Sequence, residues 1–264
     1  MSTRLDAAAA PRVRKIQILG RYTGPVMVPK PIEDLMASRQ LSLPLLVRSG
    51  SKAYGIEVEG SDDDYVGVFV ARLRDFVSIV GLERDTYAGN GPDFTIHEIG
   101  KFCRLALKGN PAILETLWNP DLVHSDSCGQ ELIRLRGRML HRGSLDVYIE
   151  YAEAQLKKMV KGRGLHSKGG EYNGKFGAHL VRLLHAGISL AATREVLVRV
   201  PAPLAATLLE IRTGKRSMTD VLGLARPLLD QLKRLASTNA LPDRPDEAAV
   251  DALVASARLS RTEA

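Results

Sequence analysis

The chain has 264 residues, 45% of them hydrophobic and 25% charged, which is the composition of a globular protein long enough to bury a substantial core. The net charge of +7 suits a polyanionic partner, while 5% aromatic residues are too few for extensive base-stacking platforms. The two cysteines lack zinc-ligand spacing, and no apolar stretch reaches membrane-spanning length or forms a signal-peptide core. We therefore expect a cytoplasmic protein with no membrane partner.

The first elements predicted along the chain are strands with one helix between them. A short strand is expected at 15–19, and a helix at 31–39, where Pro31 and two acidic residues occupy the first turn. The apolar runs at 43–47 and 65–70 are typical of strands, and 75–80 is expected to extend their sheet.

A helix is predicted at 96–108, because Thr95 and Glu98 have the spacing of a capping box. Gly109 and Asn110 end this helix, and Pro111 begins another. Strands and helices alternate here without tight hairpin signals. This order predicts an α+β fold, with a small mixed β-sheet that carries helices on one face, in a catalytic domain at 1–140.

The remainder of the chain, 141–264, predicts a helical C-terminal domain. Gly214-Lys215-Arg216-Ser217 is similar to a phosphate-binding P-loop, but Leu209 stands where that motif needs glycine, so we expect a turn that ends a helix. The apolar periodicity of the domain predicts four further helices after the one that begins near Ser144, at 176–191, 204–213, 219–235 and 247–259.

The most informative pattern is a Gly50-Ser51 turn after an apolar run, followed by Asp62 and Asp64 at the start of the next run. On an extended chain, two residues that are two positions apart project from the same face. Two carboxylates on one face repel each other unless a cation lies between them, and Mg²⁺ prefers oxygen ligands. The pattern predicts half of a metal site for phosphoryl or nucleotidyl transfer, although three consecutive aspartates also occur in solvated turns.

At these residues the chain resembles the DNA polymerase β-type nucleotidyltransferase superfamily. Within it, the chain is most similar to the predicted bacterial and phage nucleotidyltransferases that are grouped with RNA-repair ligases. The similarity is carried by Gly50-Ser51-Lys52-Ala53-Tyr54-Gly55 and Ser61-Asp62-Asp63-Asp64-Tyr65-Val66-Gly67-Val68-Phe69. It extends over roughly residues 43 to 220, and the two motifs are specific to the superfamily but not to a substrate.

The resemblance implies a role for each carboxylate of the site. Asp62 and Asp64 would be catalytic ligands of two Mg²⁺ (or Mn²⁺) ions, and a third acid would complete the metal site and orient or deprotonate the attacking hydroxyl. We assign the third role to Asp93, which would lie at the end of a later strand, next to the start of the helix predicted at 96–108, although a residue after Pro92 also suits a simple turn. Asp85 and Glu98 remain rivals for it.

The nucleotide-binding residues are also implied by the resemblance. Gly50 and Ser51 would contact the triphosphate, and Lys52 would add positive charge beside them. The side chains of Lys175, His179 and Arg182 share one face of the helix predicted at 176–191 and would neutralise phosphates, although exposed helices often carry such charges. The basic, glycine-rich segment 161–175 is of a kind that can follow a phosphate backbone or close over a bound triphosphate, and equally of a kind that forms a solvated connector.

The activity implied is metal-dependent transfer of a nucleoside monophosphate from an NTP to an acceptor hydroxyl, with release of pyrophosphate. The net charge and the resemblance favour an RNA end, particularly of tRNA, as the acceptor. A protein or small-molecule acceptor, including a toxin-type role, and an inactive basic RNA-binding module are the alternatives. The sequence predicts neither the base of the NTP nor the oligomeric state.

Overall fold

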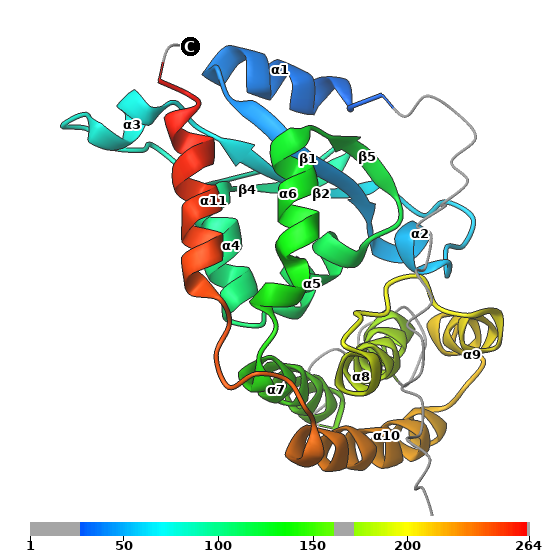
Figure 1. The fold of residues 1–264 in the computed structure, drawn as a ribbon. Helices are drawn as coiled ribbons and strands as arrows, with labels where there is room; N and C mark the ends of the chain where they lie inside the picture. Colours follow the sequence, from blue (N-terminus) through cyan, green and yellow to red (C-terminus); the bar gives the residue numbers. More distant parts are fainter. Residues whose placement is uncertain (1–26, 161–171, 263–264) are drawn as a thin grey trace, which may run out of the picture.

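The computed structural model describes residues 27–160 and 172–262 (Figure 1). The strand expected at 15–19 and most of the basic segment at 161–175 lie outside these residues. The described part contains a five-stranded mixed sheet with the order β3-β4-β2-β1-β5. Its strands are β1 (Ser42–Ser49), β2 (Asp64–Val70), β3 (Thr86–Gly89), β4 (Asp93–Glu98) and β5 (Leu122–Ser125).

The apolar runs expected at 43–47 and 65–70 form the centre of the sheet. β1 and β2 are antiparallel, whereas β2 and β4 are parallel. Successive residues of β1 alternate between two buried faces, with Leu45 in one hydrophobic cluster and Leu46 in the other. This period of two is the reason why continuous apolar runs form strands that are covered on both sides.

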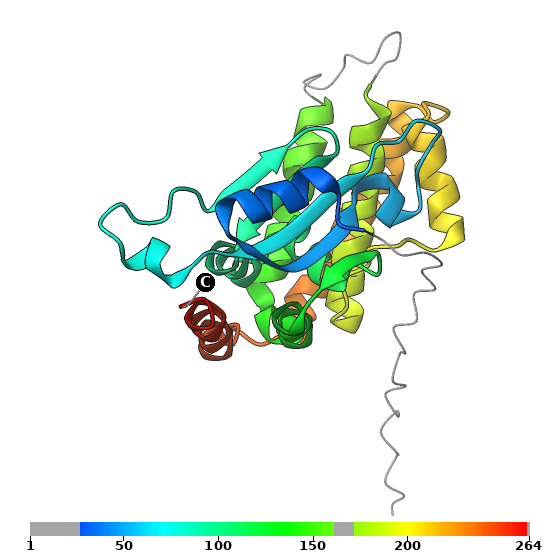
Figure 2. The same cartoon turned by 90° about the horizontal axis from the view of Figure 1, so that it is seen from above.

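Helices cover one face of the sheet as predicted, and a further helix covers part of the other (Figures 1 and 2). On the first face lie α4 (Ile99–Leu107), α5 (Pro111–Trp118) and α6 (Ser127–Leu135). On the opposite face, α1 (Lys30–Arg39) buries Ile32 and Met36, which are four residues apart and so share one side of the helix. The α+β class is confirmed.

The expected start of the helix at 96–108 is wrong. Residues Asp93–Glu98 form strand β4, and the helix begins only at Ile99, with Glu98 as its N-cap. The Glu98 carboxylate accepts hydrogen bonds from the backbone N–H groups of Gly100 and Lys101. β4 also pairs antiparallel with β3 across the short turn 90–92, a hairpin that the sequence analysis missed.

Residues 75–80 do not extend the sheet. They lie in and after α3 (Leu73–Val77), a short helix that projects from the body of the molecule in Figure 2. The Arg72 guanidinium and the Asp75 carboxylate, three residues apart, form an ion pair that suits a helical turn. The apolar side chains after it are exposed, since Ile79 and Val80 find no core to enter.

The helices predicted after residue 141 are present. They are α7 (Arg142–Val160), α8 (Gly174–Thr193), α9 (Ala202–Arg212), α10 (Met218–Thr238) and α11 (Glu247–Leu259). α8 packs against α7, α9 and α10, whereas α11 returns to pack against α4 and α6 (Figure 1). One hydrophobic cluster extends from β1 to α10 and α11. The division at residues 140 and 141 therefore stays a prediction.

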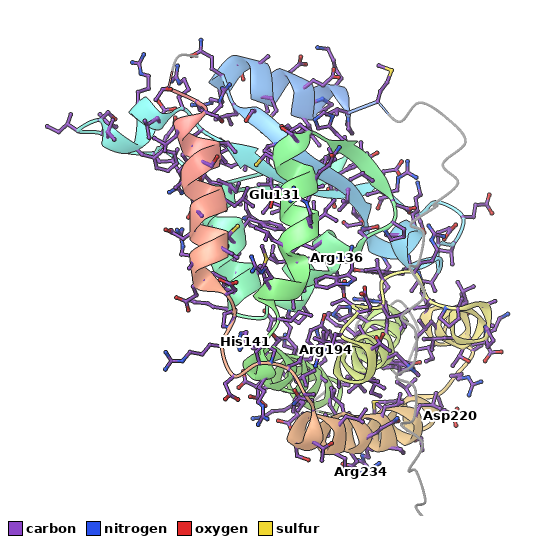
Figure 3. The ribbon with its side chains drawn as sticks, in the orientation of Figure 1. Glu131, Arg136, His141, Arg194, Asp220 and Arg234 are labelled. Atoms are coloured by element: carbon purple, nitrogen blue, oxygen red, sulfur yellow. The ribbon has the colours of Figure 1, made fainter. Side chains whose placement is uncertain are left out.

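Polar contacts also link the helices that cover the sheet to the segment between α6 and α7. The side chains labelled in Figure 3 include two of these links. Arg136 donates a hydrogen bond to the Leu117 carbonyl oxygen and lies over the ring of Trp118, 5.0 Å from its centroid. His141 Nε2 donates to the Leu107 carbonyl oxygen at 2.9 Å. No helix in the described part of the chain combines the length and hydropathy needed to cross a membrane.

Candidate active site

A cavity of about 410 Å³ lies where the ends of β1, β2 and β4 face helices α8 and α9. The sheet side contributes the glycine-serine turn and three carboxylates. The helical side contributes basic side chains. Those lining residues that the sequence analysis singled out are Gly50, Ser51, Tyr54, Asp62, Asp64, Asp93, Lys175, His179 and Arg182, and Arg212 joins them.

The turn after β1 requires glycine at its first position. Gly50 begins the short helix α2 (Gly50–Tyr54) with a φ of 69°, a conformation that L-residues with a side chain rarely adopt. A Cβ atom on Gly50 would also lie 2.0 Å from Asp64 Oδ2. The absence of a side chain therefore lets the turn and the carboxylate come together. Ser51 follows, almost fully buried in the wall of the cavity.

The sheet register brings the carboxylates to this turn. Asp64 opens β2, where it pairs with Ser49 on one side and with Asp93, the first residue of β4, on the other. Asp62 precedes β2 by two residues and lines the same cavity. Burial raises the pKa of Asp64, and the negative charges of Asp93 and Asp62 raise it further. A cation between these groups would relieve that repulsion, so the donor set fits a hard divalent ion.

No three acidic, histidine or cysteine side chains within 27–160 and 172–262 converge as closely as a complete metal site requires. The three carboxylates share a cavity, but their side chains would have to turn towards a common ion. Both rivals of Asp93 are engaged elsewhere. Asp85 forms an ion pair with Lys101 at 2.8 Å, and the buried carboxylate of Glu98 caps α4 and pairs with Arg258.

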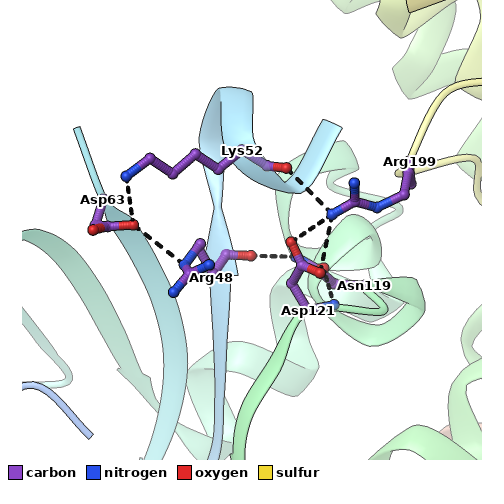
Figure 4. A network of polar contacts seen from close by, with 6 residues as sticks. All are labelled: Arg48, Lys52, Asp63, Asn119, Asp121 and Arg199. Atoms are coloured by element: carbon purple, nitrogen blue, oxygen red, sulfur yellow. Dashed lines mark hydrogen bonds and ion pairs between the residues drawn. The ribbon is translucent and has the colours of Figure 1, made fainter. Parts of the chain in front are cut away.

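The structure does not bring Lys52 into the cavity. Its ammonium group forms an ion pair with Asp63 at 2.9 Å, and the guanidinium of Arg48 lies 3.2 Å from the same carboxylate (Figure 4). Asp63, the middle aspartate of the run, is thus neutralised outside the cavity, whereas Asp62 and Asp64 line the cavity. On the other side of the turn, Arg199 pairs with Asp121 at 2.8 Å. Arg199 also donates a long hydrogen bond of 3.4 Å to the Lys52 carbonyl oxygen and so contacts the backbone of α2.

A buried polar network forms the floor of the cavity. Arg182 on α8 is 1% exposed, and its Nη1 donates to Glu115 Oε1 at 2.7 Å. The second Glu115 oxygen accepts a hydrogen bond from the Tyr54 hydroxyl at 3.0 Å. The guanidinium also lies 3.7 Å from the centroid of the Tyr54 ring. Glu115 therefore balances the charge of Arg182, and the nucleotide-binding role of Arg182 stays a prediction.

His179 is not a cation at neutral pH. Burial lowers its pKa to about 4, and the neighbouring charge of Arg182 acts in the same direction. Its Nδ1 lies 3.3 Å from Arg182 Nη2, so the ring nitrogen accepts a hydrogen bond from the guanidinium. Lys175, in contrast, is exposed at the first turn of α8. The three residues share one helix face, as their spacing predicts, but differ in charge and exposure.

Sequence reasoning missed one basic residue of the cavity. Arg212, the last residue of α9, reaches the cavity from outside both motifs. Its Nη2 donates a long hydrogen bond of 3.4 Å to Ser61 Oγ, across 151 positions of the chain. No local pattern marks such a contact, since Arg at the end of a helix is common for dipole reasons alone.

Comparisons with known proteins identify the family of the chain. No curated protein matches the chain. A family model described as the RNA repair pathway DNA polymerase beta family matches residues 28–256, which include the sheet, the cavity and most of α11. Because this match covers nearly the whole sequence, the chain belongs to the RNA repair pathway DNA polymerase beta family, whose members are polymerase β-type nucleotidyltransferases.

Proposed function

We propose that this protein transfers a nucleoside monophosphate from an NTP to the terminal hydroxyl of an RNA, with tRNA as the first candidate. The observation that carries the proposal is the pairing of Asp64 with Asp93 beside Gly50, opposite the basic side chains of α8 and α9. Acidic and basic walls that face each other suit a ligand that is a metal-bound polyphosphate. The family description supports RNA as the acceptor class.

In the proposed reaction, the acceptor oxygen attacks the α-phosphorus of the NTP, the bond to the bridging oxygen breaks, and pyrophosphate leaves. Divalent cations held by Asp62, Asp64 and Asp93 would supply the positive charge that stabilises the attacking and leaving oxygens. Asp93 orients the acceptor hydroxyl and takes up its proton. The backbone N–H groups of Gly50 and Ser51 stabilise the negative charge that develops on the departing pyrophosphate.

The helical wall positions the triphosphate in this proposal. Lys175 binds phosphate oxygens through its ammonium group. His179, being neutral, serves as a hydrogen-bonding group rather than as a counter-charge. Arg182 stays with Glu115 and keeps the Tyr54 end of α2 in place, so that the turn presents Gly50 and Ser51 to the phosphates.

The test is incubation with each NTP, labelled at its α-phosphate, together with Mg²⁺ or Mn²⁺ and total RNA, purified tRNA or a protein extract. We expect label in RNA, and none in RNA whose terminal ribose diol has been oxidised with periodate. Label in protein would mean that the acceptor is a protein and not an RNA. Binding of nucleotide or RNA without any transfer would overturn the activity and leave a binding module.

A further inference from the structure

Arg212 is a basic side chain of the cavity without a carboxylate partner among the described residues. It is half-buried, and its hydrogen bond to Ser61 Oγ, at 3.4 Å, is at the long end of the usual range. A guanidinium has five N–H donors, so most of them stay available. A partly desolvated Arg with unused donors, in a cavity, suits an anion with several oxygen atoms.

The fold places Arg212 next to Lys175 by a close approach of two helix ends. α8 begins at Gly174, and a Cβ atom there would lie 2.4 Å from the Ile211 carbonyl oxygen and 2.6 Å from that of Arg212. Only glycine therefore lets the first turn of α8 approach the last turn of α9 so closely. The Tyr172 hydroxyl, which donates to the Arg216 carbonyl oxygen at 2.9 Å, holds the same junction.

The other basic groups of the cavity have their charge balanced or absent. Glu115 neutralises Arg182 through a 2.7 Å ion pair, and His179 is uncharged at neutral pH. Lys175 and Arg212 are thus the lining residues, within the described part of the chain, that carry uncompensated positive charge opposite the carboxylates.

We propose that Arg212 binds the polyphosphate tail of the nucleotide, beside Lys175, and makes the site selective for triphosphates over monophosphates. A planar guanidinium can hold two phosphate oxygens at once, which a lysine ammonium cannot do with the same geometry. This inference deepens the proposed function and rests on it in one respect, namely that the ligand of the cavity is a nucleotide.

The test is a calorimetric titration of the full chain, in the presence of Mg²⁺, with a non-hydrolysable NTP analogue, with inorganic tripolyphosphate and with a nucleoside monophosphate. For Arg212→Ala we expect affinity for the first two ligands to fall about tenfold or more, and affinity for the monophosphate to change less than about twofold. The affinities of Arg212→Lys for these two ligands should lie between those of Arg212→Ala and those of the wild type.

The matched control is Arg216→Ala. Arg216 lies four residues further along and pairs with Glu210 outside the cavity, at 2.8 Å, so its removal takes away the same charge without touching the site. We expect this variant to bind all three ligands as the wild type does. Circular dichroism establishes whether each variant is folded. If Arg212→Ala does not fold, the same titrations with Arg212→Lys decide the question.

Three results would overturn the inference: unchanged tripolyphosphate binding in Arg212→Ala, an equal loss for monophosphate, or an equal loss in Arg216→Ala. A wild-type protein that does not bind tripolyphosphate would overturn it as well. None of these titrations requires turnover. Tail-selective binding by a protein that transfers no nucleotide would therefore refute the proposed function alone.

Discussion

At the scale of single residues, the contact between Gly50 and Asp64 defines the site. The glycine has a positive φ, and its Cα faces the carboxylate so closely that no side chain fits between them. One residue therefore serves two purposes, because it shapes the turn that we propose to bind phosphate and leaves space for the carboxylate of Asp64. The two motifs of the sequence are thus halves of one structural unit.

Gly50→Ala should abolish or strongly reduce nucleotide transfer, by at least about tenfold, because the new methyl group would displace Asp64 or the turn. Gly81→Ala is the control, since Gly81 has a φ of 72° and no atom within 4 Å of the position of a Cβ. Both variants should lose about 1–2 kcal/mol of stability through backbone strain alone. Full activity in Gly50→Ala would contradict this assignment of the turn.

His179 should make the native state sensitive to acid. Its pKa is lowered from 6.5 to about 4 in the folded protein, so the unfolded state takes up a proton first as the pH falls. Stability that is present above pH 6.5 is therefore lost between about pH 6.5 and 4, and the loss from this group is at most about 3 kcal/mol.

The measurement is the free energy of unfolding by urea at several pH values, for the wild type and for His179→Gln. The glutamine does not titrate, so the variant should lose less stability over that interval. Parallel curves for the two proteins would show that the ring is already protonated, or solvated, in the native state.

At the scale of elements, the network of Tyr54, Glu115 and Arg182 joins three helices. Tyr54 ends α2, Glu115 belongs to α5 and Arg182 to α8, so the Gly50-Ser51 turn is connected to the helical wall through the core. Burial raises the pKa of the Tyr54 hydroxyl, which keeps it protonated as a donor to Glu115. Such a network is costly to break because one buried charge is left without a partner.

Glu115→Ala should reduce the free energy of unfolding by about 3–5 kcal/mol, since it leaves the Arg182 guanidinium buried and unpaired. Glu153→Ala removes the partner of Lys233 from a half-exposed pair between α7 and α10, and should cost less than about 1 kcal/mol. Similar losses in the two variants, measured by chemical denaturation, would mean that water reaches Arg182 in the native protein.

The sequence was sufficient to predict the elements that have a strong local pattern. The apolar runs of β1 and β2, and helices such as α1 and α11, were predicted within a few residues. Short strands were not: β3 and β5 have four residues each, and their place is decided by partners far along the chain. The spacing of Thr95 and Glu98 indicated a helix start, but pairing with β2 makes this segment a strand.

The site could be predicted as far as its two motifs extend. The spacing of Asp62 and Asp64 and the glycine of the turn carry local chemical information. The proximity of Asp93 depends on the parallel pairing of β2 with β4, which the sequence did not predict; the family resemblance implied only that a third acid completes the site. Lys52 was predicted to bind nucleotide because it adjoins the turn, yet Asp63 holds it outside the cavity. Arg212 had no local signal, since tertiary packing alone brings it to Ser61.

At the scale of the whole molecule, the candidate site lies between the sheet and the helices that follow it. The sheet contributes the carboxylates and the turn, while α8 and α9 contribute the basic side chains. A metal–nucleotide complex would therefore connect both parts of the chain and stabilise them together. The continuous hydrophobic core gives the two walls a common support, so the proposed ligand would meet a cavity that already exists.

Addition of an NTP with Mg²⁺ should raise the melting temperature of the protein. At one hundred times the dissociation constant, binding adds about 2.7 kcal/mol to the stability of the native state. Removal of the metal with a chelator should reduce the shift, because the acidic wall then repels the phosphates. An equal shift with and without the metal would exclude a metal-bridged complex between the two walls.

The most direct measurement is transfer from an α-labelled NTP by four single variants, Asp62→Asn, Asp63→Asn, Asp64→Asn and Asp93→Asn. Three of these carboxylates line the cavity, whereas Asp63 is bound to Arg48 and Lys52 outside it. We predict that the three cavity variants stay folded and lose turnover, and that Asp63→Asn, which lies within the same run of aspartates, retains it. Turnover that survives in Asp62→Asn and Asp64→Asn, or that fails equally in Asp63→Asn, would contradict the account.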